Sequence, residues 1–443
     1  MIEALTRGIK LGGITNSLVK TEIAEIKSSA NFCVPLKSGA GSESKPLVIV
    51  GDLIKRGTVI GAPSDETSGF VYSPCSGAVV SIKDKVNSLG ENCLNVEIEP
   101  SHKDSLLYFR PLENHDNNNL FGRLIESGSF DNWGQRYPSY HKYINPNTIG
   151  ARTIIVKLFD SDPYCVSNLK IAEQYAKEVA LGALCYFKVG VAVKLIFVGS
   201  KAVSKATNQK IYDAILDEIN KSDMKTNQVS FVTVSKVYPN DEDHLLTKKV
   251  LKKTISISVP VSDKGIFIEN AQTCLNFYRA VFDNLPTTEA VYTIAGNNLK
   301  NQGVYLVKNG LVPQNVFASV DIKNKELFRQ YSIGGTFNGI SQCDTSVGLP
   351  LSVSTLFSNK WNEENFKERD CINCGRCNAR CPIKLSPMMI DNFAINKDFA
   401  RAKRYGVLSC IDCGVCSYVC PAKRHLSQRI SDTAQAIKQR RTM

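Results

Sequence analysis

The stretch CINCGRCNARCP, from Cys371 to Pro382, places four cysteines close together, and CIDCGVCSYVCP, from Cys410 to Pro421, repeats the arrangement. Both follow the spacing C-x2-C-x2-C-x3-C-P, in which three thiolates hold one iron-sulfur cluster and the fourth binds a second cluster. Zinc is the competing interpretation, but a zinc site closes with four ligands and does not require these further cysteines before a proline. The repeated spacing therefore predicts two [4Fe-4S] clusters.

Exchange of the fourth ligand assigns the cysteines to the two clusters. The predicted ligands of the first cluster are Cys371, Cys374, Cys377 and Cys420. Those of the second cluster are Cys410, Cys413, Cys416 and Cys381. Gly375 and Gly414, each directly after a second cysteine, would let the backbone approach a sulfide. Residues 391–407 between the arrays have a helical composition, so we expect a helical ferredoxin-like module that conducts electrons between partners.

Length and composition describe an ordinary globular chain of several domains, with 443 residues of which 43% are hydrophobic. No apolar run approaches the roughly 18 residues of a membrane span, and the best candidate, residues 189–199, is expected to be a buried strand. The N-terminus lacks the pattern of a secretory signal, so we expect 15 cysteines in a reducing compartment, where metal or redox chemistry is favoured over disulfides. The net charge of +12 suits an acidic partner, an anionic membrane or a generally basic surface, and no nucleic-acid partner is predicted.

The first hundred residues alternate short β-rich runs with Gly and Asp turn signals, which is typical of a small β-sandwich. The pattern resembles biotinyl and lipoyl carrier domains. Such carriers need a lysine at a hairpin tip, whereas residues 62–70, APSDETSGF, contain none. We therefore expect the carrier fold without its swinging-arm function.

The order of these parts resembles the C subunit of Rnf-type ion-translocating oxidoreductases, which is related to the A subunit of sodium-translocating NADH:quinone oxidoreductase. The matching stretches include GGI at Gly12, PL at Pro35, DPY at Asp162, TIAG at Thr293, IGG at Ile333 and both cysteine arrays. The resemblance implies an α/β multidomain fold. Its expected domains are a carrier-like β-sandwich (1–105), a Rossmann-like α/β domain that resembles flavin and NADH domains (106–250), a β-grasp domain (251–345) and a helical two-cluster ferredoxin-like domain (346–443).

This resemblance implies an electron-transfer subunit of a membrane-associated, ion-translocating complex, peripheral on the cytoplasmic side of the membrane. Its partners would be the integral-membrane and redox subunits, with a ferredoxin-like protein or NADH as possible donor. The alternative is a cytoplasmic Rnf-C-like electron carrier that serves a reductase, such as a proline reductase or a cobalamin-reductase system. Neither alternative decides whether the chain is itself an enzyme.

The middle region decides whether the chain is expected to bind FMN or NADH. Where the family has a glycine-rich loop, this chain reads DNWGQRYPS (131–139), with Trp133 and Arg136 in place of glycines and Gly134 retained. A following acidic signature appears as DSDPY (160–164), so Asp160 and Asp162, with Gly134, are the candidate cofactor-binding residues. The alternative role of the two acids is structural, in a turn before a helix. The filled loop leaves FMN binding open and predicts weak or absent NADH binding.

Three further features lie outside these motifs. Cys165, directly after DPY, is a candidate redox thiol, although an isolated cysteine is more often a small buried apolar residue. Lys423 and Arg424 follow the second array and are expected to help docking onto an acidic partner or an anionic membrane. Arg440 and Arg441, at the end of the chain, are expected to be solvated.

Overall fold

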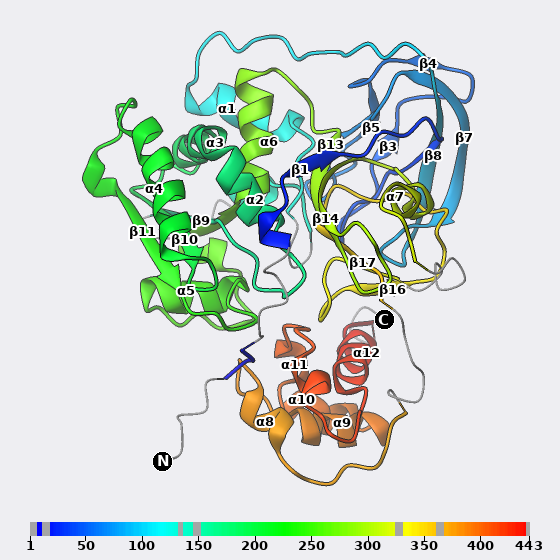
Figure 1. The fold of residues 1–443 in the computed structure, drawn as a ribbon. Helices are drawn as coiled ribbons and strands as arrows, with labels where there is room; N and C mark the ends of the chain where they lie inside the picture. Colours follow the sequence, from blue (N-terminus) through cyan, green and yellow to red (C-terminus); the bar gives the residue numbers. More distant parts are fainter. Residues whose placement is uncertain are drawn as a thin grey trace.

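The computed structural model describes residues 7–10, 18–131, 136–144, 152–323, 331–359 and 367–439. Figure 1 shows three parts: an α/β part, a β-rich part beside it, and a helical module below both that contains the two cysteine arrays. Trp133, Gly134, Arg440 and Arg441 lie outside the described residues.

Two small antiparallel sheets form the N-terminal β unit, in the orders β2-β8-β7-β4 and β3-β5-β6. Val34, Val96 and Ile98 from β2 and β8 are fully buried between the strands. The predicted β-sandwich-like N-terminal region is therefore confirmed. The strands are β2 Phe32–Pro35, β3 Lys45–Pro46, β4 Leu53–Ile54, β5 Val59–Ala62, β6 Val71–Tyr72, β7 Gly77–Val86 and β8 Asn92–Pro100.

A six-stranded mixed sheet, in the order β1-β14-β13-β17-β15-β16, completes the β-rich part. It shares one hydrophobic core with the N-terminal unit, since Tyr292 and Leu356 pack in the same cluster as Val34. Beside the sheet, α7 spans Pro313–Ser319. The strands are β1 Ile23–Glu25, β13 Glu289–Ala295, β14 Gly303–Lys308, β15 Tyr331–Ile333, β16 Ile340–Gln342 and β17 Thr355–Phe357.

The α/β part contains a four-stranded parallel sheet in the order β11-β10-β9-β12. Ile154 and Val156 of β9 pack against α2, α3, α4 and α6, whereas Ile155 faces the opposite core, to which α5 contributes Leu246. Because both faces are covered, the strands read as continuous apolar runs. The buried strand expected within 189–199 is β10, Lys194–Ser200.

The remaining elements of the α/β part surround this sheet. The helix expected after residue 164 is interrupted at Tyr175, whose backbone leaves the helical region, and is therefore two helices, α2 and α3. The strands are β9 Thr153–Lys157, β11 Val229–Val234 and β12 Ile266–Asn270. The helices are η2 Leu18–Lys20, α1 Asn117–Glu126, η3 His141–Tyr143, α2 Ser167–Gln174, α3 Ala176–Val189, α4 Lys205–Ile219, η4 Thr226–Gln228, α5 Asp243–Leu251, η5 Val261–Lys264 and α6 Ala271–Phe282.

The C-terminal module is helical in its described residues and packs around Ile390, Val407 and Ile430. The predicted helical connector between the arrays consists of α9 and α10. Phe337 joins the module to the rest of the chain, because its ring lies 4.7 Å from that of Tyr238 and 5.0 Å from that of Tyr418. The helices are α8 Arg376–Arg380, α9 Pro387–Ile395, α10 Phe399–Arg404, η8 Val407–Ser409, α11 Val415–Tyr418 and α12 Leu426–Gln439.

Candidate metal centres

The two cysteine arrays have the same local backbone. Gly375 and Gly414 adopt left-handed conformations, with φ of 68° and 71°, and each directly precedes a short helix, α8 or α11. Asn373 and Asp412, each directly before the second cysteine of its array, are also left-handed, with φ of 55° and 48°. Asn and Asp tolerate this conformation better than most residues. The repeated sequence therefore produces the same loop around the first three cysteines of each array.

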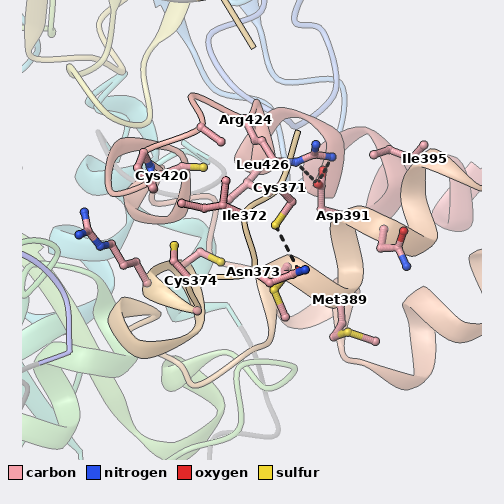
Figure 2. Close-up of a pocket in the computed structure, with 17 residues that line it drawn as sticks. Cys371, Ile372, Asn373, Cys374, Met389, Asp391, Ile395, Cys420, Arg424 and Leu426 are labelled. Atoms are coloured by element: carbon pink, nitrogen blue, oxygen red, sulfur yellow. Dashed lines mark hydrogen bonds and ion pairs between the residues drawn. The ribbon is translucent and has the colours of Figure 1, made fainter. Parts of the chain in front are cut away.

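The first cavity draws its cysteines from both arrays. It has a volume of about 360 Å³ and lies between the loop of the first array, α9 and the end of the second array. Figure 2 shows Cys371, Cys374 and Cys420 around it. Its four cysteines are Cys371, Cys374, Cys377 and Cys420. This is the set that exchange of the fourth ligand predicts.

The second cavity repeats the exchange in the opposite direction. It is smaller, about 20 Å³, and is lined by apolar side chains such as Leu385 and Ile430. Its four cysteines are Cys381, Cys410, Cys413 and Cys416. Among the described residues, no group of three or more His, Cys, Asp or Glu side chains is arranged to hold a single metal ion. In a four-iron cluster each thiolate binds a different iron, so the ligands surround a cavity, and these two sets do so.

Burial disfavours the charged thiolate form of the cysteines around the second cavity. It raises the pKa of Cys413 and of Cys416 to about 12 and also raises the pKa of Cys410, because the charged form loses water. Without a cation these side chains stay neutral thiols at pH 7. Binding of iron would have to displace their protons, as a coordinating metal does. The donor set thus fits an iron-sulfur cluster.

A buried carboxylate supports the wall of the first cavity. Asp391 of α9 is 2% exposed and accepts hydrogen bonds from Arg424 Nε at 2.9 Å and Arg429 Nε at 2.5 Å. Arg429 also donates to Glu368 at 3.0 Å, and this contact lowers the pKa of Glu368. Arg424 is therefore an internal structural residue, which corrects the expectation that it serves docking. Lys423, next to it, is exposed.

The candidate cofactor-binding residues Asp160 and Asp162 form hydrogen bonds with other residues of the protein. Asp160 accepts hydrogen bonds from the backbone N–H of Asn168 at 2.9 Å and from its side-chain amide at 2.7 Å, at the start of α2. Asp162 accepts from the backbone N–H of Thr336 at 2.8 Å and of Tyr164 at 3.0 Å. Burial raises the pKa of Asp160 to about 6 and also raises that of Asp162. Both acids therefore occupy structural positions that tie loops together.

The candidate redox thiol, Cys165, is 5% exposed. Burial raises its pKa, as it does for a thiol without a cationic neighbour. Its sulfur lies 3.6 Å from Ser354 Oγ, across the contact with the β-rich part. These surroundings fit a small buried side chain and not an accessible, ionised thiol.

A larger cavity, of about 770 Å³, is lined both by the α/β part and by the cluster module. Lys142 lies in its wall and pairs with Asp131 at 2.9 Å and with Glu269 at 3.0 Å. Burial alone would lower the pKa of Lys142, but the two acids raise it. Cys410, a candidate ligand of the second cluster, borders the same cavity. The sequence analysis missed this network; its only sequence signal is an acid, Glu269, within the apolar run of β12.

Arg136 also borders this cavity, where the filled loop meets the β-rich part. A side-chain carbon on Gly334 would lie 2.9 Å from Arg136 Nη2, so the guanidinium packs directly over that glycine. Asp160 and Asp162 already have partners. Gly134, the third candidate for flavin contact, lies outside the described residues, so FMN binding by this region stays a prediction.

Three protein-family models match separate parts of the chain. They describe the RnfC barrel sandwich hybrid domain (residues 4–103), the Nuo51 FMN-binding domain (126–279) and a 4Fe-4S dicluster domain (364–425). Within the described residues, no helix combines the length and apolar character needed to cross a membrane.

Similar curated proteins include C subunits of ion-translocating complexes. The C subunit of the proton-translocating ferredoxin:NAD(+) oxidoreductase complex of Clostridium ljungdahlii is 27% identical over 403 residues, covering 90% of this chain and 86% of the relative. The C subunit of the ion-translocating oxidoreductase complex of Buchnera aphidicola is 26% identical over 352 residues, covering 78% and 72%. Among solved structures, an NAD+-reducing [NiFe]-hydrogenase in its H2-reduced state matches with a TM-score of 0.51 and 13% identity, covering 74% of this chain and 64% of its own, a likeness of fold alone.

Proposed function

We propose that this chain, which is similar to Rnf C subunits and matches a 4Fe-4S dicluster domain, is the electron-transfer subunit of a membrane-associated, ion-translocating oxidoreductase complex. Electrons would pass through two [4Fe-4S] clusters in the C-terminal module. The observation that carries the proposal is the exchange of cysteines between the two arrays, which yields one cavity per predicted ligand set. An isolated metal site would not require this exchange.

The ligand assignment follows the cavities. One cluster would be held by Cys371, Cys374, Cys377 and Cys420. The other would be held by Cys410, Cys413, Cys416 and Cys381. Support for two closely spaced clusters comes from the packing of α8, in the first array, against α11, in the second.

The protein's own residues would control the surroundings of each cluster. When bound, a [4Fe-4S] cluster accepts or releases one electron at a time. Leu385 and Ile430 exclude water from the second site, while Asp391 and its two arginines hold α9 against the segment after Cys420. Because hydrogen bonds, local charge and solvent exposure set cluster potentials, these differences would give the two clusters different potentials.

We propose further that this chain exchanges electrons without FMN or NADH bound to its middle region. The engagement of Asp160 with Asn168 and of Asp162 with Thr336 supports this, as does Arg136 over Gly334. Electrons would then enter and leave through protein partners. In the complex, these partners would be the integral-membrane and redox subunits, with the chain peripheral on the cytoplasmic side.

Within the part of the chain that the structure describes, the engagement of Asp160 and Asp162 by protein partners also favours the second candidate, a cytoplasmic Rnf-C-like carrier that serves a reductase. Such a carrier needs the clusters and a docking surface but no site for NADH. The two candidates differ in the protein that binds the full chain.

For the domains, we propose the same four regions with two boundaries moved. The division predicted from the sequence falls at 105, 250 and 345. The pairing of β12 with β9 supports including residues up to Phe282 in the α/β region. The pairing of β17 with β13 supports including residues up to Phe357 in the β-rich region.

The experiment is anaerobic purification of the tagged full chain from its own host, with and without detergent. The proposal expects about eight irons per chain, from two four-iron clusters, and integral-membrane subunits in the detergent-solubilised sample. Stoichiometric zinc, or iron for a single cluster, would reject the two-cluster assignment. Recovery of a reductase in the detergent-free sample, without membrane subunits, would select the carrier.

A further inference from the structure

The two cysteine sets differ in their access to solvent. In the first set Cys371 and Cys374 are exposed, Cys420 is half-buried and Cys377 is buried. In the second set no cysteine is exposed: Cys410 is half-buried, and Cys381, Cys413 and Cys416 are buried. Electron transfer between proteins requires close approach of the two redox centres. If the proposed clusters are present, the first cluster is therefore the one that a protein partner can approach directly.

Apolar side chains surround the exposed site. Ile372 is 67% exposed and Ile395 is 52% exposed, and both line the first cavity together with Met389. Figure 2 shows Ile395 and Met389, both from the region of α9, on one side of Cys371. Large exposed apolar residues that cluster at one site mark an interaction surface more often than isolated ones do.

The charge around this site is positive. Residues 371–439 contain 11 Lys and Arg against 4 Asp and Glu. Two of the four acids are already paired within the module: Asp391 with Arg424 and Arg429, and Asp398 with Arg401. Internal pairing leaves the excess of positive charge on the surface of the module.

Two exposed cations belong to the segments that form the first cavity. Arg376, at the start of α8, lines it. Lys423 lies in the chain between Ala422 and Arg424, which both line it. Lys423 follows Cys420 by three residues and is held in a left-handed turn, with φ of 55°. An apolar centre with a charged rim is the usual anatomy of a protein interface.

We propose that the surface formed by Ile372, Arg376, Ile395 and Lys423 docks an acidic electron-carrier protein at the exposed cluster. The proposal rests on the proposed function, since it requires a cluster in the first cavity. One electron passes between the two proteins: the carrier's redox centre is oxidised by one electron as the cluster is reduced by one, or the reverse. No proton, bond or further reactant is involved.

A protein carrier fits this surface better than an anionic bilayer. Membrane surfaces bind extended amphipathic faces with a broad apolar side, whereas here two isoleucines adjoin a cofactor cavity. Transient redox encounters use small interfaces, below about 1,200 Å², and complementary charge raises their association rates by about 10- to 1,000-fold.

The test compares two charge-reversal pairs in the anaerobically purified full chain. One is Arg376→Glu with Lys423→Glu. The matched control is Lys205→Glu with Lys210→Glu, two exposed positions of α4 that change the net charge equally. Stopped-flow absorbance would follow electron exchange with a reduced acidic two-cluster ferredoxin as probe, at low and high ionic strength, together with iron content.

At low ionic strength we expect the Arg376/Lys423 variant to exchange electrons at least about 10-fold more slowly, with unchanged iron, and the control to stay within about 2-fold of wild type. The difference should shrink at high salt, because screening shortens the range of charge interactions. Equal effects of both pairs, or no effect of either, would overturn the docking surface. If wild type binds anionic vesicles and the Arg376/Lys423 variant does not, the surface faces a membrane and the carrier proposal is wrong. Absence of iron in wild type would instead reject the proposed function itself.

Discussion

Cys420, from the second array, lines the same cavity as Cys377, from the first, and the nearby Cys420 sulfur raises the pKa of the Cys377 thiol after burial has raised it. This relationship links the two arrays into one folding unit, because neither cavity is complete without a cysteine from the other array.

The exchange of ligands predicts for which pairs of cysteine substitutions the losses of iron add up. Cys420→Ser should remove the cluster held by the first array, so iron should fall from about eight to about four per chain. Cys374→Ser combined with Cys420→Ser should lose no more, because both affect one cluster. Cys413→Ser combined with Cys420→Ser should lose both clusters. Iron analysis and electron paramagnetic resonance of the reduced protein would measure this, with the exposed Cys343→Ser as control. The reverse pattern of additivity would mean that the ligands are not exchanged.

The buried carboxylate of Asp391 should be important for stability. Asp391→Asn removes the buried one of the two carboxylates that pair with both Arg424 and Arg429, and only the more exposed Glu368 remains. Breaking a buried ion pair costs up to about 3–5 kcal/mol, and Glu368 offsets part of this cost. We expect a lower denaturation midpoint and loss of iron from the first cluster. Asp432→Asn, on the exposed side of α12, makes the same chemical change and should have little effect. Similar midpoints for the two variants would show that the Asp391 pair contributes no net stability.

Because Asp160 and Asp162 are hydrogen-bonded to protein groups, we expect no cofactor in the middle region. The purified chain should release no stoichiometric FMN on acid treatment, and a fluorescence titration should show no saturation up to about 1 mM NADH, the upper end of ordinary KM values. Asp162→Asn should lower stability, because Thr336 and Tyr164 donate to this carboxylate. Tight, saturable NADH binding that Asp162→Asn abolishes would reverse this interpretation.

Burial of Asp160 predicts a dependence of stability on pH. Its pKa in the folded chain is about 6, against about 3.9 in an unfolded chain. The folded state therefore binds the proton more tightly, and this contribution to stability is fully present below about pH 4 and is lost as pH rises through 6. Asp160→Asn removes the titration. The stability of wild type relative to Asp160→Asn should fall between pH 5 and pH 7, measured by urea denaturation; a constant difference would mean that Asp160 does not titrate in this range.

The sequence by itself determined the parts of this protein that depend on local spacing. The C-x2-C-x2-C-x3-C-P arrays predicted both ligand sets, and the structure places each set around one cavity. Apolar runs predicted the buried strand β10, because a strand covered on both faces needs no polar residues. The helical connector and the β-sandwich-like region followed from composition and turn signals in the same way.

Only the tertiary structure decided what the side chains contact across the chain. The sequence left Asp160 and Asp162 as candidate cofactor-binding residues or as structural acids in a turn, and the partners of Asp162 include Thr336, from a distant part of the sequence. Arg424 looked like an exposed docking residue, but the packing of α9 and α12 brings Asp391 against it. The difference in exposure between the two cysteine sets is likewise invisible in two nearly identical motifs, because solvent access depends on which neighbouring elements cover each motif after folding.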